Sequence, residues 1–461
     1  MNNKMTAVCG FGKTGQALLE YLLAHEGERR PLLFTDEPLP PSAQDAQRRF
    51  AAAGVEFLNG EDFPRLQQAS TVILSPGING WSPRFDALRQ AHIEIVSEIE
   101  YACRQIASPI IAVTGANGKS TTVCLIHHLL QTAGQSSVLA GNIGTPLVSL
   151  LGQIGASDPV VLEVSSFQLE EIVRFRPHIA LLLNITPDHL DRYPVMDDYI
   201  RAKLNIFRNQ TEDDFMILNV DDPWSGANRT RLLADGRAQA LWFSRKRRPQ
   251  GRGAFWTGDA VEVKVNGEWQ PVSLRRNPLT GVHNLENIMA AFLAAAVIGV
   301  SGQDLETGLA SFRGLEHRMQ AVGRIGDVEF INDSKATNVD AALKSLISIP
   351  APMVIILGGK DKGGDFSVLA EPLRQRAAKI LLLGKAAPLI AGQLRTLAER
   401  FVPVRDLREA VATGYRILHE RGGVVLLAPG CASFDMFDNF EHRGRVFAAE
   451  VRALREQTAH G

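Results

Sequence analysis

The feature that most constrains the fold is a glycine-rich stretch, GANGKST at residues 115–121, which directly follows the apolar run at residues 109–114. A buried strand that ends at glycines and continues as a helix turns backbone N–H groups and the positive end of the helix dipole toward one point. Lys119 adds a positive charge there, and Ser120 places a hydroxyl where a phosphate-bound Mg²⁺ could use it. We therefore predict an ATP or GTP site. The loop is a variant, because Val113 stands where the usual pattern has its first glycine.

Length and charge limit the classes of protein to which the chain can belong. At 461 residues it is too long for one core, and a typical domain length of about 150 residues suggests three domains. The charges of the 49 basic and 50 acidic residues nearly cancel, so the net charge gives no indication of binding to nucleic acid or to an anionic membrane. The basic cluster at residues 245–248 is followed by proline and glycine, which favours a solvated loop over a binding patch.

Neither the start of the chain nor its apolar runs suggest export or membrane insertion. Residues 1–6 are polar and unlike a signal sequence, and the longest apolar run, residues 288–300, fits a buried helix and is too short for a membrane span. The four cysteines lack the paired spacing of zinc, redox or disulfide sites. We expect a cytoplasmic protein with core or incidental thiols.

The first segment opens like a Rossmann fold. A strand at residues 6–9 is followed by GFGKTG at residues 10–15 and a helix, and a second strand ends near Asp36. A later strand ends in SPGIN at residues 75–79, at the edge where parallel sheets bind ligands. This segment has about five short strands, roughly half of what a full dinucleotide-binding domain uses. A site for a mononucleotide or a nucleotide sugar is therefore favoured over a dinucleotide site. Asp36 either contacts a ribose hydroxyl or serves as a turn or helix-cap acid.

Three polar groups follow the phosphate loop in the central segment. Glu163 ends an apolar strand and is placed to hold the metal of the nucleotide, although it could instead cap the next helix. The next strand runs into Asp188-His189-Leu-Asp191, in which the histidine is either a metal or phosphate contact or an ordinary hydrogen-bonding group. By spacing alone, Lys203 lies on the polar face of an amphipathic helix.

The remaining sequence predicts an α/β protein of three domains, each built on a mainly parallel sheet. We predict a Rossmann-like N-terminal domain at 1–97, a central P-loop ATPase domain at 98–301 and a Rossmann-like C-terminal domain at 302–461. Residues 238–274 form a β-rich edge of the central sheet. In the last domain, GGKDKGG at 358–364 favours a flexible substrate loop over a second phosphate site, because no Ser or Thr follows its lysines.

Taken in order, the GANGKST loop, the Glu163 strand, the Asp-His-Leu-Asp loop and the Lys203 helix resemble the Mur ligase family. Its members are ATP-dependent enzymes that add amino acids to the peptidoglycan precursor, and the resemblance covers essentially the whole chain. It implies two Mg²⁺ ions, one held by Ser120 and Glu163 and the other by His189 and a carbamylated Lys203. The implied catalytic residues are Lys119, Asn142, His189 and Lys203. The implied ATP contacts are Gly115, Ala116, Asn117, Gly118, Lys119, Ser120, Thr121, Asn287, Arg318 and Asp333.

Two C-terminal motifs are similar to the D-glutamate-adding members of this family: NDSKATN at 332–338 and SFDMFDNFEHR at 433–443. The Asp-Asn-Pro-Arg string of the diaminopimelate- or lysine-adding branch is absent. The resemblance implies a monomer that joins D-glutamate to UDP-MurNAc-L-Ala through an acyl phosphate. Phe434, Met436 and Lys13 depart from the diagnostic pattern. The implied D-glutamate contacts are Lys335, Thr337, Ser433 and Phe440, and those of the UDP substrate are Gly12, Lys13, Thr14, Asp36, Ser75, Gly77, Asn79 and Asn142.

Two alternatives from other classes of protein, and two within the ligases, remain open at this point. An NAD(P) oxidoreductase would explain the glycines at residues 10–15 and Asp36, but it leaves Lys119, Glu163 and His189 without a role. A nucleotide-gated regulator would bind ATP without ligase chemistry. Within the ligases, the alternatives are another amino-acid-adding enzyme or a folyl-polyglutamate-type synthetase.

Overall fold

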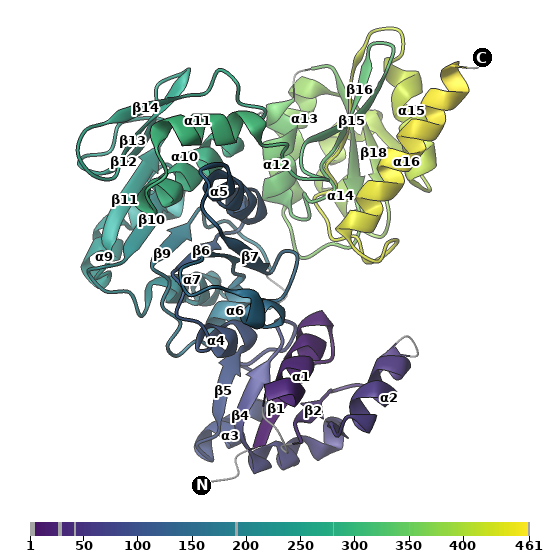
Figure 1. Cartoon of the computed structure of the whole chain (residues 1–461). Coiled ribbons are helices and arrows are strands. Elements are labelled where there is room, and N and C mark those ends of the chain that lie inside the picture. Colours follow the sequence, from purple (N-terminus) through teal and green to yellow (C-terminus); the bar gives the residue numbers. More distant parts are fainter. Residues whose placement is uncertain are drawn as a thin grey trace. The chain divides into compact units, whose positions relative to one another are not determined.

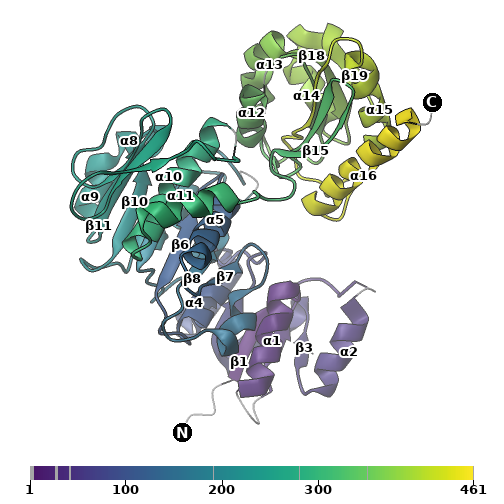
Figure 2. The same cartoon turned by 45° about the horizontal axis from the view of Figure 1, so that its top comes forward.

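The computed structural model describes residues 5–25, 30–40, 43–189, 192–279, 281–349 and 351–459. These residues form three sheets, of five, nine and six strands, with helices packed around them (Figures 1 and 2). The chain divides into two compact units. Unit 1 comprises Met1–Ile185, Asp197–Arg275 and Asn287–Gly308, and unit 2 comprises Thr186–Met196, Arg276–Glu286 and Leu309–Gly461. The domain boundaries after residues 97 and 301 stay predictions.

The N-terminal sheet of unit 1 has the strand order β3-β2-β1-β4-β5 and is parallel throughout. Apolar strands alternate with helices, and β1 lies between β2 and β4, so the order reverses beside it, where open α/β sheets bind ligands. The predicted five strands are confirmed. They are β1 Met5–Cys9, β2 Leu32–Phe34, β3 Glu56–Leu58, β4 Ala69–Leu74 and β5 Glu94–Ser97, with α1 Lys13–His25, α2 Gln44–Ala52, η2 Gly60–Gln68, η3 Pro83–Phe85, α3 Asp86–Gln90 and α4 Glu98–Cys103.

The central sheet has the order β14-β13-β12-β11-β10-β9-β6-β8-β7. It is parallel from β7 to β12, and β12, β13 and β14 are antiparallel neighbours, which confirms the predicted β-rich edge. The strands are β6 Ile110–Thr114, β7 Val138–Gly141, β8 Val160–Glu163, β9 Ile179–Leu182, β10 Phe215–Asn219, β11 Gln239–Ser244, β12 Gly253–Trp256, β13 Ala260–Lys264 and β14 Gln270–Ser273. The helices are α5 Lys119–Thr132, η4 Leu147–Gln153, α6 Ser166–Glu170, α7 Met196–Leu204, η5 Asn205–Phe207, α8 Pro223–Ala227, α9 Arg229–Asp235, α10 Val282–Val297 and α11 Gly302–Ser311.

The C-terminal sheet of unit 2 has the order β15-β16-β20-β17-β18-β19, and only the edge pair β15 and β16 is antiparallel. Its strands are β15 Gln320–Ile325, β16 Val328–Asn332, β17 Met353–Gly358, β18 Ala377–Leu383, β19 Phe401–Pro403 and β20 Gly423–Leu427. Its helices are α12 Val339–Ser348, η6 Phe366–Leu369, α13 Ala370–Arg376, α14 Ala387–Gln393, η7 Arg395–Arg400, α15 Leu407–Leu418 and α16 Phe440–Ala459.

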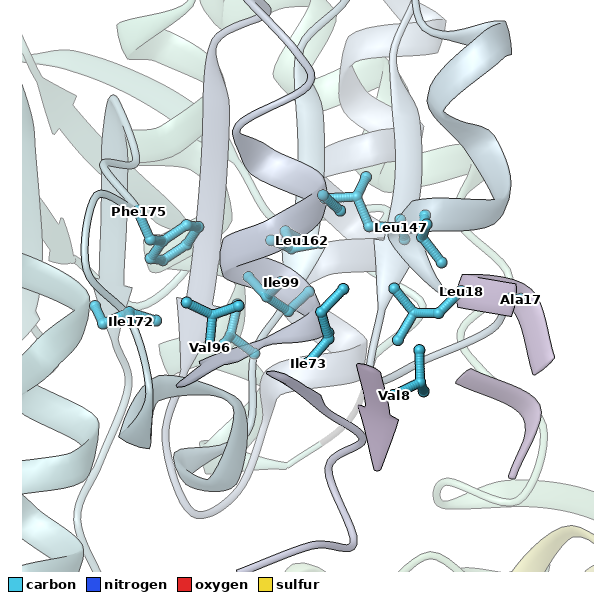
Figure 3. Close-up of a cluster of buried hydrophobic side chains, with 14 of the residues drawn as sticks. Val8, Ala17, Leu18, Ile73, Val96, Ile99, Leu147, Leu162, Ile172 and Phe175 are labelled. Atoms are coloured by element: carbon cyan, nitrogen blue, oxygen red, sulfur yellow. The ribbon is translucent and has the colours of Figure 1, made fainter. Parts of the chain in front are cut away.

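One hydrophobic core continues from the N-terminal sheet into the central sheet (Figure 3). Leu18 of α1, Ile99 of α4, Leu147 of η4 and Leu162 of β8 all belong to it, and each is fully buried. Burying such a side chain stabilises the fold by roughly 1.5–3 kcal/mol. The shared core explains why these two sheets form a single compact unit.

The predicted buried helix at residues 288–300 is confirmed as far as Val297, where α10 ends, and residues 288–295 are inaccessible to solvent. Across the described part of the chain, the helices are all too short or too polar to cross a lipid bilayer.

Candidate active site

The phosphate-loop sequence forms the predicted strand, loop and helix. β6 ends at Thr114, α5 begins at Lys119, and Gly118 between them has a φ of +88°. A Cβ atom at Gly118 would lie 2.2 Å from the Asn287 Oδ1 atom, so a larger residue would displace one of the two. The structure thus places Asn287, a predicted nucleotide contact, directly against the loop.

An asparagine at the end of the neighbouring strand holds the phosphate loop. Asn184 follows β9, which pairs with β6. Its side-chain Oδ1 atom accepts a hydrogen bond from the Asn117 N–H at 2.9 Å, and its Nδ2 atom donates to the Asn117 carbonyl at 3.0 Å. Its own carbonyl accepts from the Ala116 N–H at 3.1 Å. The role of Asn184 was not predicted, although an asparagine at the exit of a strand beside the loop was a usable signal.

Two lysines converge on the carbonyl of Gly115. Lys119 Nζ donates to the Gly115 and Ala116 carbonyls at 2.9 Å, and Lys203 Nζ donates to the Gly115 carbonyl at 2.9 Å. Lys203 is only 2% exposed, and its ammonium lies 4.6 Å from the centre of the Tyr199 ring. The interpretation that Lys203 lies on a solvated polar face is therefore wrong. Helical spacing could not show that α7 turns this residue toward the end of β6.

Glu163 lies at the carboxyl end of β8, beside the phosphate-loop strand. Val113 is its register partner on β6, and its side chain is buried. Its Oε1 atom accepts a hydrogen bond from Asn142 Nδ2 at 3.0 Å. Ser165, with Gln168, caps the following helix, so the alternative that Glu163 is the cap is wrong. The structure therefore brings together two residues that were predicted to belong to the site.

The predicted UDP-substrate residues other than Asn142, which follows β7 of the central sheet, follow three adjacent parallel strands of the N-terminal sheet. Ser75, after β4, donates a hydrogen bond to the Gly10 carbonyl, after β1, at 3.3 Å. Asp36, after β2, forms an ion pair with Arg84, whose guanidinium lies over the Phe63 ring. Arg84 was missed because it is 48 residues away from Asp36 in sequence. Gly12, Lys13 and Thr14 lie at the start of α1, while Gly77 and Asn79 lie in the turn after β4.

The loop that carries His189 belongs to unit 2. His189 has a φ of +54°, and its N–H donates to the Asp188 Oδ1 atom at 2.9 Å. Asp188 also accepts from Asn338 Nδ2 at 3.0 Å and from Lys362 Nζ at 3.1 Å. Lys362 comes from the predicted substrate loop at residues 358–364, but its partner was not foreseen. Asp191, the second acid of this motif, lies outside the described residues.

Two of the predicted D-glutamate residues, Lys335 and Phe440, are in contact in unit 2, and a buried arginine bonds the residue before Lys335. The Lys335 ammonium lies 3.9 Å from the centre of the Phe440 ring. Arg443, which is 1% exposed, donates to Ser334 Oγ at 2.9 Å, to the Ser334 carbonyl at 2.7 Å and to the Cys431 carbonyl at 3.1 Å. It thereby holds the segments next to Lys335 and Ser433. Burial lowers the pKa of the Arg443 guanidinium to about 10.

Family models match three consecutive stretches of the chain: the Mur ligase MurD-like N-terminal domain at residues 4–97, the Mur ligase middle domain at 113–295 and the Mur ligase glutamate ligase domain at 317–431. The UDP-N-acetylmuramoylalanine–D-glutamate ligase of Pelotomaculum thermopropionicum is 38% identical over 456 residues, which cover 98% of each chain. The protein of the same name from Trichlorobacter lovleyi is 39% identical over 457 residues, covering 98% of this chain and 100% of its own. The chain belongs to the Mur ligase family.

Solved structures share the fold of this Mur ligase. MurF from Acinetobacter baumannii has a TM-score of 0.62 at 18% identity, covering 92% of this chain and 90% of its own. The UDP-N-acetylmuramate–alanine ligase MurC of Thermotoga maritima has a TM-score of 0.58 at 17% identity, covering 98% of this chain and 99% of its own. The predicted α/β architecture of three domains with mainly parallel sheets is confirmed. Membership in a ligase family also replaces the oxidoreductase and regulator alternatives.

Arg318, a predicted ATP contact in unit 2, lies on a strained turn of this Mur ligase, and Asp333, the other one, follows β16. His317 and Met319, on either side of Arg318, have φ values of +61° and +46°, which non-glycine residues rarely adopt. Asp333 is buried, and it accepts hydrogen bonds from the Met319 N–H at 3.2 Å and from the Ser345 hydroxyl. Burial raises the pKa of the Asp333 carboxyl. The Ser345 hydroxyl, the Arg318 charge and the Met319 N–H lower this pKa and so offset part of the increase. The turn therefore fixes Arg318 close to a buried acid.

Proposed function

We propose that this Mur ligase uses ATP to add D-glutamate to UDP-N-acetylmuramoyl-L-alanine in peptidoglycan precursor synthesis. The observation that carries the ligase chemistry is the phosphate loop with Glu163, Asn142 and Lys203 gathered around it. The choice of D-glutamate is supported by full-length relatives named as D-glutamate ligases. ATP use is supported by a MurF ligase of the same fold from Thermotoga maritima, solved in complex with ADP (TM-score 0.57, 16% identity).

The proposed reaction has two steps. In the first, an oxygen of the L-alanyl carboxylate attacks the γ-phosphorus of ATP, the bond to the β–γ bridging oxygen breaks, and ADP leaves. In the second, the amine nitrogen of D-glutamate attacks the acyl carbon, the bond from carbon to the phosphate oxygen breaks, and the amine loses a proton. The products are the C–N bond, ADP and phosphate. Activation is needed because a carboxylate is a poor acyl donor in water.

The chain supplies positive charge and hydrogen-bond donors where negative charge develops. Lys119 and the N–H groups at the start of α5 bind the transferring phosphoryl group, and Arg318 binds ATP phosphate. Such preorganised electrostatic stabilisation is usually the largest contribution to catalysis. Asn142 orients the reacting carboxylate, since its amide is already fixed by Glu163 at 3.0 Å. Asn287, packed on Gly118, contacts the adenine, and Asp333 contacts the ribose.

The residues present fit a Mg²⁺ ion bound with ATP. Ser120 and Glu163 are both buried and lie at the start of α5 and the end of β8. No group of three or more His, Cys, Asp or Glu side chains within the described residues could hold a metal, which is consistent with an ion that takes most of its ligands from phosphate and water. When bound, Mg²⁺ neutralises charge on the phosphates. His189 and a carbamylated Lys203 would hold a second ion.

The two substrates are assigned to the sheets that flank the ATP site in the sequence. The UDP moiety binds at the carboxyl edge of β1, β2 and β4, through Gly12, Lys13, Thr14, Asp36, Ser75, Gly77 and Asn79. D-Glutamate binds in unit 2 through Lys335, Thr337, Ser433 and Phe440, because a lysine with hydroxyl groups suits a dicarboxylate. We assign the reaction to the cytoplasm and to a monomer.

The test is phosphate release from ATP and Mg²⁺ in the presence of UDP-MurNAc-L-Ala. Release should require D-glutamate and should not occur with L-alanine, meso-diaminopimelate or L-lysine in its place. ATP turnover without a D-glutamate-dependent product would remove the assignment. For Lys203, the alanine variant should regain activity with short-chain carboxylic acids, and no rescue at all would argue against the carbamate.

A further inference from the structure

The loop at residues 141–148 carries Asn142 and is tied to the central sheet at its first half. The Asn142 N–H donates to the Glu163 carbonyl at 2.9 Å, and the Asn142 side chain donates to the Glu163 carboxylate at 3.0 Å. The Gly141 N–H donates to the Thr145 carbonyl at 3.1 Å, which closes the turn. These hydrogen bonds end at Thr145, two residues before η4 begins at Leu147.

A buried carboxylate from outside the central sheet holds the second half of the loop. Glu98 is the first residue of α4, directly after β5 of the N-terminal sheet, and is 1% exposed. Its Oε1 atom accepts the Val148 N–H at 3.0 Å, and the Leu147 N–H also bonds to this carboxyl. Its Oε2 atom has no hydrogen-bond partner among the described residues. Burying a carboxylate is costly, so these two N–H groups are its main compensation.

A lysine from the N-terminal sheet contacts the middle of the same loop. Lys13 is the first residue of α1, and its Nζ atom donates to the Gly144 carbonyl at 2.5 Å. Apolar packing supports the same arrangement, because Leu147 lies in one core with Leu18 of α1 and Ile99 of α4 (Figure 3). The loop is therefore held from two helices that belong to the N-terminal sheet and its exit.

We propose that Glu98 and Lys13 are positioning residues that hold the loop at residues 141–148 and so place Asn142 against the reacting groups. The inference rests on the proposed function, in which the UDP substrate lies on the N-terminal sheet and Asn142 lies beside its carboxylate. Glu98 and Lys13 belong to the helices around the N-terminal sheet, where the UDP substrate is proposed to bind, and Asn142 follows β7 of the central sheet, which carries the phosphate loop. The loop therefore fixes the position of the substrate carboxylate relative to the bound ATP. A misplacement of about 1 Å at such a site can cost roughly 100-fold in rate.

The experiment compares variants that remove each contact with variants that keep it. Glu98→Leu and Lys13→Met remove the acceptor and the donor, whereas Glu98→Gln and Lys13→Arg retain them. We expect Glu98→Leu and Lys13→Met to lower the kcat for D-glutamate-dependent phosphate release by about tenfold, with the KM for ATP changed less than about twofold. Glu98→Gln and Lys13→Arg should recover most of the rate.

Hydrogen exchange at the Val148 N–H gives a second measurement that needs no substrate. Exchange should be faster in Glu98→Leu than in the wild type, and a protein that lacks D-glutamate-dependent activity would still show this difference. Failure of the proposed function is thereby distinguished from failure of the positioning role. If Glu98→Leu does not fold, Lys13→Met with its arginine counterpart decides the question through exchange at Thr145 and Asn142, which is measured without substrate and so does not depend on the UDP contact assigned to Lys13.

Glu171→Gln is the matched control. Glu171 is also a largely buried carboxylate between the two sheets of unit 1, but it pairs with Arg89 at 2.6 Å and not with the loop. It should keep wild-type kcat and wild-type exchange at Val148. The proposal is overturned if Glu98→Leu and Lys13→Met keep wild-type kcat and exchange, or if Glu171→Gln shows the same losses.

Discussion

The phosphate loop of unit 1 and the loops around Lys335 in unit 2 are held in place by different means. The phosphate loop is shaped by a turn at Gly118 that has no room for a side chain, and the neutral Asn184 side chain and carbonyl bond to its backbone. The loops of unit 2 depend on the Arg443 guanidinium, which bonds to Ser334, 109 residues away in sequence. The glycine turn of the phosphate loop leaves a contiguous signature in the sequence, whereas the loops of unit 2 depend on one distant, buried guanidinium.

Gly118→Ala should have the largest effect. The new methyl group meets Asn287 and the backbone is held at a positive φ, so we expect ATP-dependent phosphate release to fall by about 100-fold. Gly134→Ala is the matched control, because Gly134 also has a positive φ, +75°, but a Cβ atom there would touch nothing within 4 Å. Equal losses of activity in both variants would show that backbone strain alone, and not the fit of the loop, is responsible.

Arg443→Met should have a smaller and more selective effect on activity. Removing the guanidinium leaves two carbonyls and a hydroxyl buried without their donor, which should lower the free energy of unfolding by about 3 kcal/mol. We expect the KM for D-glutamate to rise about tenfold while the KM for ATP changes less. Urea denaturation and steady-state kinetics measure these two effects. Arg452→Met, on the exposed side of α16, should change neither, and a KM change shared by both variants would contradict the role of Arg443.

Glu98→Gln tests a third arrangement, a buried side chain that holds backbone N–H groups. Burial raises the pKa of the Glu98 carboxyl from 4.5 to about 7, so the folded protein binds this proton more tightly than the unfolded chain. The wild type therefore loses stability as the pH rises from about 4.5 to about 7, and the glutamine variant does not. The difference in unfolding free energy, variant minus wild type, should increase by up to about 3 kcal/mol between pH 5 and pH 8. A difference independent of pH would contradict a raised pKa.

Lys362→Met should have the smallest effect. It removes an ion pair with Asp188 that is largely but not fully buried, and Asp188 keeps its hydrogen bond from Asn338. We expect a loss of about 1 kcal/mol in the free energy of unfolding, measured by urea denaturation. Asn338→Ala with Lys362→Met should then cost more than the sum of the single changes, because the buried Asp188 carboxylate loses two side-chain donors at once. Additive losses would show that the two contacts are independent.

Most of the secondary structure could be predicted because apolar strands, glycine turns and helices alternate with clear periods. The strands β1, β2, β6 and β8, the β-rich edge and the buried helix α10 all lie where the sequence placed them. The direction of Lys203 could not be predicted. A lysine at that helical spacing is normally solvated, and only the packing of α7 against the end of β6 makes it a buried donor.

The long-range contacts of the site were also beyond sequence reasoning. Arg84 with Asp36, Glu98 with Val148, and Arg443 with Ser334 join residues that are 48, 50 and 109 positions apart. Each is a common residue type in an ordinary setting, so local patterns carry no sign of the pairing. The sequence also could not show that the His189 loop belongs to unit 2, because Asp188 of this loop is bonded by the distant residues Asn338 and Lys362.

The sequence by itself determined the phosphate loop, the order of the strands along the chain and the family of the protein. It could do so because a glycine turn between a buried strand and a helix is a local requirement of the backbone. Only the tertiary structure decided which side chains hold the loops that carry Asn142, His189 and Lys335. Those partners are chosen by which surfaces the sheets bring together, and burial makes such contacts strong only after the chain has folded.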